Sequence, residues 1–287
     1  HVVFGKDETT VPRVRMNLFE ADKEVMRSVH FSYAQTASQT FNAIFDNRRV
    51  FENPKSIDDI KKLVEYVTVK DDCDIILDFF SGSATTAHAV MHLNAGDGGH
   101  RKFIMVQWPE LCAEGTEAAN AGYKNICEIG KERIRRAGDK IKADTPLGTK
   151  DLDIGFRVFR VDSSNMKDVY YQPEELEQQS LFSLVSNIKD DRTDLDLLYA
   201  CLLDWGVEIH LPHTSTDLDG CTVHNVDNGA LMACFSPNVP RSVVEFMAKQ
   251  QPLRAVFRDS AFASDDAKIN VTEIFKNLSP DTKVKVI

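Results

Sequence analysis

The sequence lacks the residue patterns that define several common kinds of site and segment. Its six cysteines form no CxxC pair, so ligand pairs at zinc spacing are missing and the thiols are expected to be reduced. No apolar run approaches about 18 residues, and the first ten residues have no basic-then-apolar pattern, which argues against a membrane span and a signal peptide. We therefore expect a cytoplasmic protein with no metal site.

Two nucleotide-binding fingerprints are also missing. The sequence contains neither GxGxxG nor GxxxxGK[ST], the glycine patterns that bring a backbone close to a pyrophosphate or a nucleotide phosphate. This excludes the usual dinucleotide fingerprint and the usual phosphate loop.

Excess positive charge is lacking in the second half of the chain. Residues 1–56 have a balance of +1 and residues 57–150 of −2, whereas residues 151–287 hold 22 acids against 13 bases, a balance of −9. Phosphate contacts come from lysine and arginine. The C-terminal half is therefore a poor candidate for binding duplex DNA and a better one for binding a protein partner, the alternative being a segment that only adds solubility.

The first half alternates strands and helices. The apolar pattern predicts a helix at 57–67, a buried strand at 74–80, a helix from Thr85, a second buried strand at 102–107, and a long helix or helix pair at 117–142. This order predicts a parallel βαβ unit, hence an α/β fold. A linker is expected at 143–153.

The second half predicts a separate, smaller α/β domain at 154–287. We expect strands at 155–161, 207–211, 221–226, 230–235, 253–257 and 283–287, and helices at 173–188, from 193, near 241–250 and near 266–277. Thr193 with Asp196 has the spacing of a capping box. Asp227-Asn228-Gly229 predicts a hairpin turn, and the terminal strand is a candidate sheet edge.

The segment Asp78-Phe79-Phe80-Ser81-Gly82-Ser83-Ala84-Thr85-Thr86 is the most informative stretch. It leads from a strand into a helix through small residues. Gly82 permits close backbone approach to a ligand, and the free amides of the helix start attract an anion. A plain strand-to-helix turn is the alternative, because glycine and serine favour such turns anyway.

This segment resembles the D-[PF]-F-x-G-S-G-T-T motif of amino-methylating DNA methyltransferases of the permuted kind. With FENPKS at 51–56, the stretch LDFFSGSATTAHAVMHLNAGDGGHRKFIMVQWPE, and GYKNICEIGKERIRRA, the chain resembles the C-terminal part of type III restriction-modification Mod subunits over nearly its whole length. The resemblance implies part of a doubly wound Rossmann-like methyltransferase sheet. It also implies that residues 1–50 end a target-recognition region, that 51–142 form the cofactor-binding half, and that 154–287 form an assembly domain.

By this resemblance, eleven residues would bind S-adenosyl-L-methionine: Pro54, Lys55, Ser56, Asp78, Phe79, Phe80, Ser81, Gly82, Ser83, Thr85 and Gln107. Lys55 suits the methionine carboxylate as a point charge, the alternative being a solvated surface lysine. Gln107 stands where related enzymes often place an acid for the ribose hydroxyls, and Glu110 is the alternative. Ala84 replaces a frequent glycine.

The catalytic tetrapeptide [DNS]-P-P-[YFW] is absent from the sequence. In that motif a polar side chain accepts from the target amino group and an aromatic ring stacks on the flipped base. We therefore predict a fragment of an adenine (N6) DNA methyltransferase without catalytic residues of its own. The resemblance implies three partners, namely double-stranded DNA through the full subunit, a second Mod chain and the restriction (Res) subunit.

Two other functions remain open from the sequence. One is a non-catalytic DNA-recognition or subunit-interaction module that retains the methyltransferase fold. The other is a methyltransferase acting on RNA or a small molecule. The reading frame upstream of His1 would separate an enzyme fragment from a module.

Overall fold

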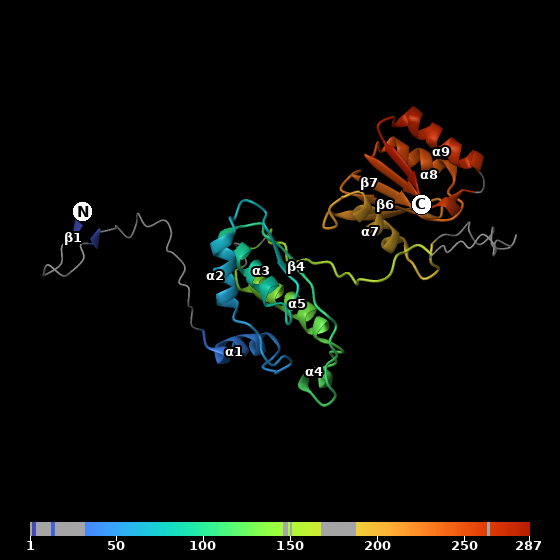
Figure 1. Cartoon of the computed structure of the whole chain (residues 1–287). Helices are drawn as coiled ribbons and strands as arrows, with labels where there is room; N and C mark the ends of the chain where they lie inside the picture. Colours follow the sequence, from blue (N-terminus) through green and yellow to red (C-terminus); the bar gives the residue numbers. More distant parts are fainter. Residues whose placement is uncertain are drawn as a thin grey trace, which may run out of the picture. The chain divides into compact units, whose positions relative to one another are not determined.

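The computed structural model describes residues 2–3, 13–14, 32–145, 149, 151–167, 188–262 and 265–287. The chain divides into two compact units, His1–Phe156 and Arg157–Ile287 (Figure 1). No described helix is both long and apolar enough to cross a membrane.

The described part of unit 1 combines five helices with two small sheets. Its elements are β1 (Val2–Val3), β2 (Arg13–Val14), α1 (Ala34–Ile44), α2 (Ile57–Val67), β3 (Ile75–Asp78), α3 (Thr85–Asp97), β4 (Lys102–Met105), α4 (Glu117–Asn120) and α5 (Ile126–Asp144). The short strands β1 and β2 pair antiparallel. The predicted helix at 117–142 is a helix pair, separated near Gly122, whose φ of +89° favours glycine.

The centre of unit 1 is the predicted parallel βαβ unit. Strands β3 and β4 pair in parallel, with Ile76 beside Phe103 and Asp78 beside Met105, and α3 forms the crossover between them. Parallel pairing places the ends of both strands at one edge of the sheet. The turn that follows Asp78 therefore lies next to the residues that follow β4.

Among the described residues, helices cover only one face of this two-stranded sheet. Ile76, Phe103 and Met105 pack against helices α2, α3 and α5. On the other face Ile75, Leu77, Ile104 and Val106 keep between 47% and 60% of their surface exposed. The prediction of two fully buried strands was therefore wrong within the described part of the chain, because a parallel sheet buries both faces only when both are covered.

Helix α1 joins this unit through its apolar face. Phe41 is fully buried, and its ring lies 4.8 Å from that of Phe45. The guanidinium of Arg136, in α5, donates to the Ile44 carbonyl and to the Asp46 carboxylate. Helix α1 thus contacts α5, although the resemblance assigns residues 1–50 to a target-recognition region.

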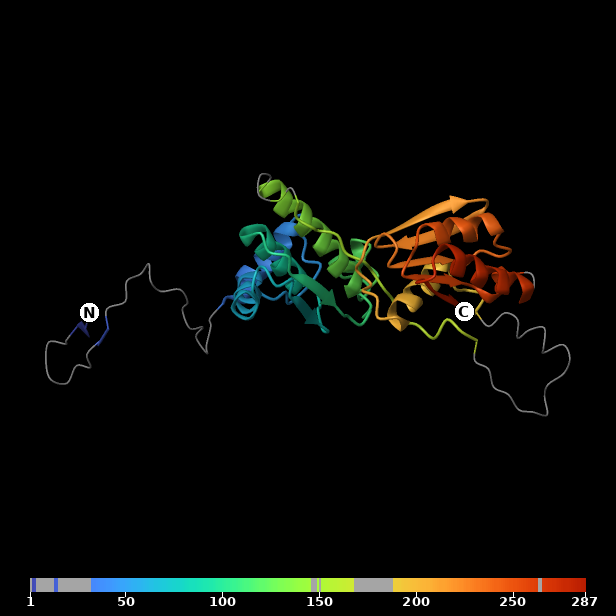
Figure 2. The same ribbon diagram turned by 90° about the horizontal axis from the view of Figure 1, so that it is seen from above.

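Unit 2 is a five-stranded mixed sheet in the order β5-β6-β7-β8-β9. Its elements are α7 (Asp194–Asp204), β5 (His213–Leu218), β6 (Cys221–Val226), β7 (Leu231–Cys234), α8 (Arg241–Lys249), β8 (Arg254–Phe257), η2 (Asp259–Ala261), α9 (Asp265–Leu278) and β9 (Lys283–Val286). Strands β5 to β7 are antiparallel, and β8 and β9 continue the sheet in parallel. Helices α8 and α9 cover one face and α7 the other (Figure 2).

Local signals of unit 2 are confirmed. Thr193 caps α7 in a capping box with Asp196. Asp227 and Asn228 adopt left-handed backbone angles between β6 and β7, as a tight hairpin requires. Strand β9 lies at the sheet edge with Lys283 and Lys285 exposed; exposed lysines discourage further strand pairing at such an edge.

Two predicted strands of unit 2 were wrong. Residues 155–161 form no strand, and Val161 is 97% exposed. Residues 207–211 form a loop whose apolar side chains pack against the α7 side of the sheet. The strand lies instead at His213–Leu218. The helix predicted at 173–188 falls almost entirely outside the described residues.

Candidate functional site

The candidate site is the turn that joins β3 to α3. Ser81 donates its backbone N–H to the Val106 carbonyl (3.2 Å), and Ala84 donates to the Ser81 carbonyl (2.7 Å). Gly82 has a φ of +51° and Ala84 of +58°. This left-handed conformation costs a residue with a β-carbon about 1–2 kcal/mol. The turn therefore holds a strained alanine beside a glycine that has no such cost.

Asp78, at the end of β3, accepts two hydrogen bonds within this turn. Its Oδ2 accepts from the Thr86 hydroxyl (2.6 Å), and its Oδ1 accepts from the Phe80 N–H (3.3 Å). The carboxylate thus ties the end of the strand to the first turn of α3. In the structure, Asp78 therefore stabilises the conformation of the turn.

Gln107 connects the turn to the second strand. Its Oε1 accepts from the Gly82 N–H at 2.6 Å, and its Nε2 donates to the Trp108 carbonyl at 3.0 Å. Gln107 therefore lies at the candidate site, with both ends of its amide engaged. The alternative, Glu110, is exposed in the loop that follows.

Two aromatic side chains project from the turn into solvent. Phe79 is 60% and Phe80 is 81% exposed, and their ring centroids lie 5.2 Å apart. Large apolar side chains exposed as a pair beside a glycine turn offer a surface on which a planar ligand can stack.

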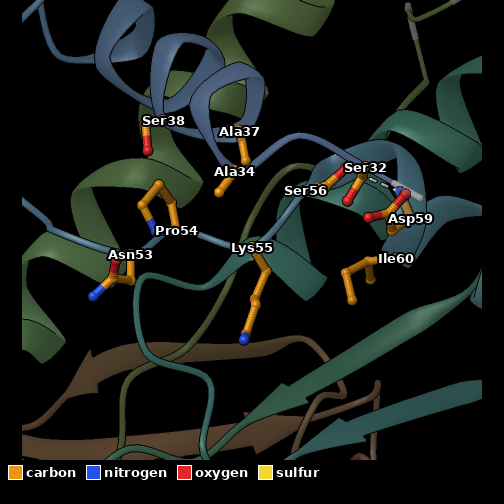
Figure 3. A pocket seen from close by; sticks show the side chains of 10 residues that line it. All are labelled: Ser32, Ala34, Ala37, Ser38, Asn53, Pro54, Lys55, Ser56, Asp59 and Ile60. Carbon is orange, nitrogen blue, oxygen red and sulfur yellow. Dashed lines mark hydrogen bonds between the residues drawn. The ribbon is translucent and has the colours of Figure 1, made fainter. Parts of the chain in front are cut away.

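The segment 53–56 lines a hollow of about 450 Å³ next to α1. Pro54 is buried, and Ser56 caps α2 by accepting from the Asp59 N–H. The exposed side chain of Lys55 extends away from Ala37 and Ser38 of α1 (Figure 3). The other lining residues are Ser32, Ala34, Asn53 and Ile60.

The side chain of Phe51, two residues before the segment 53–56, lies beside the turn. A β-carbon on Gly82 would lie 3.5 Å from Cζ of Phe51. A β-carbon on Gly130 of α5 would lie 3.4 Å from the Gly82 carbonyl oxygen. The turn therefore has close neighbours in Phe51 and α5, and larger residues at these two glycines would crowd it.

Arg133, which the sequence analysis did not single out, is the most buried charged residue at the site. It lies in α5 with no exposed surface, and its Nη1 donates to the Ser83 hydroxyl (2.8 Å) and the Thr85 hydroxyl (2.6 Å). The signal was present in the sequence. Arg133 falls among the residues Ile129, Ile134, Ala137 and Ile141 that form the buried face of α5.

Burial shifts the pKa of two basic groups here. Loss of hydration lowers the pKa of Arg133 to about 9, so its guanidinium is still charged at neutral pH. Burial, aided by the charge of Arg133, lowers the pKa of His88 to about 3. The His88 imidazole is therefore neutral at pH 7.

No group of three His, Cys, Asp or Glu side chains that could hold a metal ion occurs among the described residues. The six cysteines are free, and Cys201, Cys221 and Cys234 are buried. Burial raises the pKa of Cys201 and of Cys234 to about 11, so these two thiols stay protonated at neutral pH.

The structure thus shows a parallel strand–turn–helix–strand unit whose turn carries an exposed aromatic pair and accepts hydrogen bonds from a buried arginine of α5. These features fit the class of α/β proteins that bind ligands at the carboxyl ends of their strands. All proposed residues of 78–85 and Gln107 lie at this turn, and Pro54, Lys55 and Ser56 line the hollow beside α1.

Comparison with known proteins gives related sequences. The chain is 36% identical over 171 residues to the type III restriction-modification enzyme StyLTI Mod subunit of Salmonella typhimurium, covering 55% of this chain and 24% of that protein. It is 34% identical to the EcoPI Mod subunit of Escherichia phage P1, over 61% of this chain and 26% of the relative. The EcoP15I Mod subunit of Escherichia coli matches 92% of this chain at 27% identity, covering 39% of the relative.

The chain is therefore related to type III restriction-modification Mod subunits, and it spans about a quarter of the length of the StyLTI and EcoPI relatives. It is also 34% identical over 107 residues to the type II methyltransferase M.KpnI of Klebsiella pneumoniae. No family model matches the chain.

Proposed function

We propose that this chain is the S-adenosyl-L-methionine-binding part of a site-specific adenine (N6) DNA methyltransferase, the modification subunit of a cytoplasmic type III restriction-modification system. The observation that carries the proposal is the turn after Asp78. It follows a parallel strand and opens a helix, the place where open α/β sheets bind ligands, and its sequence resembles the cofactor motif of amino-methylating DNA methyltransferases.

The residues present fit the proposed cofactor. Gly82 takes the left-handed conformation of the turn without the cost of a β-carbon, and Gly130 lets α5 pack close to the Gly82 carbonyl. Phe79 and Phe80 offer exposed aromatic surface to an adenine ring. The cofactor would supply a methyl group on a sulfonium centre, and these residues would bind and orient it. No ribose contact is assigned to the Gln107 oxygen, which already accepts from Gly82.

The exposed sheet face supports a larger methyltransferase domain. Parallel sheets bury both faces under helices, whereas Ile75, Leu77, Ile104 and Val106 are exposed in the described part of this unit. We propose that in the whole subunit further strands extend this sheet into a doubly wound Rossmann-like sheet, that helices of the same domain cover this face, and that the domain includes the catalytic tetrapeptide that this sequence lacks.

This function predicts cofactor binding without methyl transfer. The 287-residue chain should bind S-adenosylmethionine weakly and saturably in equilibrium dialysis. It should incorporate no methyl label into duplex DNA, because the groups that would align the adenine amino group are absent. Incorporation at the rate of an intact Mod subunit would refute the assignment. Failure to bind the cofactor would favour a module that retains the fold without the chemistry.

Unit 2 is proposed to bind protein partners, a second Mod chain and the restriction subunit, while DNA is bound through the full subunit. Its acidic balance repels a phosphate backbone on average. Residues 151–287 expressed alone should co-purify with Mod or the restriction subunit and show no retention on duplex DNA at moderate salt. Duplex binding comparable to that of an intact subunit would contradict the proposal.

A further inference from the structure

We propose, on the basis of the proposed function, that Arg133 is a positioning residue that directs the carboxylate of the cofactor's methionine part to the N-terminus of α3. Arg133 would act from beneath the turn, through Ser83 and Thr85, without touching the cofactor itself.

The geometry places the arginine under the turn. Besides the two hydroxyls, its Nη1 donates to the Ser83 carbonyl at 3.3 Å. The guanidinium carbon lies 5.0 Å from the centre of the Phe41 ring, so α1 also contacts Arg133. Arg133 is therefore fixed between α1 and the residues that open α3.

The charge of Arg133 is not compensated within the described residues. The structure gives it no ion pair there, and its Nε and Nη2 have no hydrogen-bond partner. A buried cation without a counter-ion is costly and is usually paired. His88, the other buried titratable group beside it, is neutral. Among the described residues, Arg133 is thus a buried positive charge without an ion pair beside the start of α3.

The start of α3 has backbone N–H groups that no side chain caps. The nearby Asp78 carboxylate accepts from the Thr86 hydroxyl and the Phe80 N–H instead, so the first N–H groups of this 13-residue helix, at the positive end of its dipole, have no side-chain acceptor. Since the Thr85 hydroxyl oxygen accepts from Arg133, its hydrogen is available to donate to an anion. In S-adenosylmethionine the sulfonium and amino groups are positive and the carboxylate is the only anion. The carboxylate is therefore the part that this site would favour.

A ligand comparison can separate an electrostatic role from a structural one. The full chain, Arg133→Met and the control Arg135→Met would be titrated with S-adenosylmethionine and with decarboxylated S-adenosylmethionine. Arg135 lies two residues away in the same helix, and its side chain is 55% exposed. The unchanged chain should prefer the carboxylated ligand by roughly tenfold to a hundredfold, the range of one hydrogen bond to a charged group.

In Arg133→Met this preference should fall by about tenfold, with affinity for the decarboxylated ligand nearly unchanged, and Arg135→Met should keep the full preference. Equal losses for both ligands would overturn the proposal, because a loosened turn would weaken both. If the unchanged chain binds neither ligand, the proposed function itself is refuted.

Two further variants test the proposal even if Arg133→Met does not fold. Arg133→Lys keeps the charge and should retain part of the preference. Thr85→Val keeps the shape of the side chain but removes the hydroxyl that connects Arg133 to the start of α3, so it should lower the preference even where Arg133→Met does not fold. An unchanged preference in a folded Thr85→Val protein, as judged by circular dichroism, would contradict the proposal.

Discussion

Replacing Gly82 with valine is expected to abolish measurable binding of S-adenosylmethionine. Gly82 has a φ of +51°, a conformation that costs ordinary residues about 1–2 kcal/mol and β-branched residues more. The new side chain would also stand against Phe51, whose Cζ lies 3.5 Å from the β-carbon position. The turn would shift, and the cofactor could no longer approach the backbone of Gly82 closely. Isothermal titration calorimetry should show a loss of affinity of at least roughly tenfold.

Gly122→Val is the matched control for backbone strain. Gly122 also has a positive φ, +89°, but no atom lies within 4 Å of its β-carbon position, and it lies between α4 and α5. This variant should lose similar stability while binding the cofactor within about twofold of the unchanged chain. Equal affinities for the two variants would show that the Gly82 turn is not the binding site.

Phe41→Ala is expected to destabilise unit 1 by about 3–5 kcal/mol, the usual cost of removing a buried aromatic ring. Phe41 has no exposed surface and contacts the rings of Phe45 and Phe51 as well as the guanidinium of Arg133. Loss of the Phe41 ring would leave a cavity and remove a contact of the buried Arg133 guanidinium. Hydrogen exchange followed by mass spectrometry should show faster exchange in α1 and α5.

Tyr33→Ala is the control substitution for Phe41→Ala, at the residue that precedes α1. Tyr33 precedes α1, is 83% exposed and makes no side-chain cap, so its removal should change stability by less than about 0.5 kcal/mol. Exchange in β6, β7 and β8 should be unchanged in both variants, since these strands belong to the other unit. Protection of α1 that survives Phe41→Ala would contradict the packing described for unit 1.

The βαβ unit was predictable because its signals are local. A run of apolar residues before Asp78, small residues around Gly82 and threonines at 85 and 86 specify a strand, a turn and a helix start within a few residues. The parallel pairing of β3 and β4 then follows, because a helix connects them. The hairpin at 227–229 was found for the same reason.

The predictions from sequence were wrong or incomplete where contacts between distant parts of the chain determine the structure. Residues 207–211 alternate apolar and polar side chains, yet they form a loop whose apolar residues cover the core beside α7. Strand β5 has mostly exposed polar residues, HTSTDL, because an edge strand needs no continuous apolar face. Arg133 was overlooked because a charged residue in a helix is usually solvated, and only packing against α1 and the turn makes it buried.

The most direct test of the account is photo-crosslinking of methyl-labelled S-adenosylmethionine to the full chain, followed by tryptic mapping. The turn lies in the peptide of residues 71–101, and Gln107 in the peptide of residues 103–124. We predict label in one or both of these peptides, competed by unlabelled S-adenosylhomocysteine and lost in Gly82→Val. Competed label confined to residues 157–287, with none in unit 1, would contradict the assignment of the cofactor site to the turn after β3.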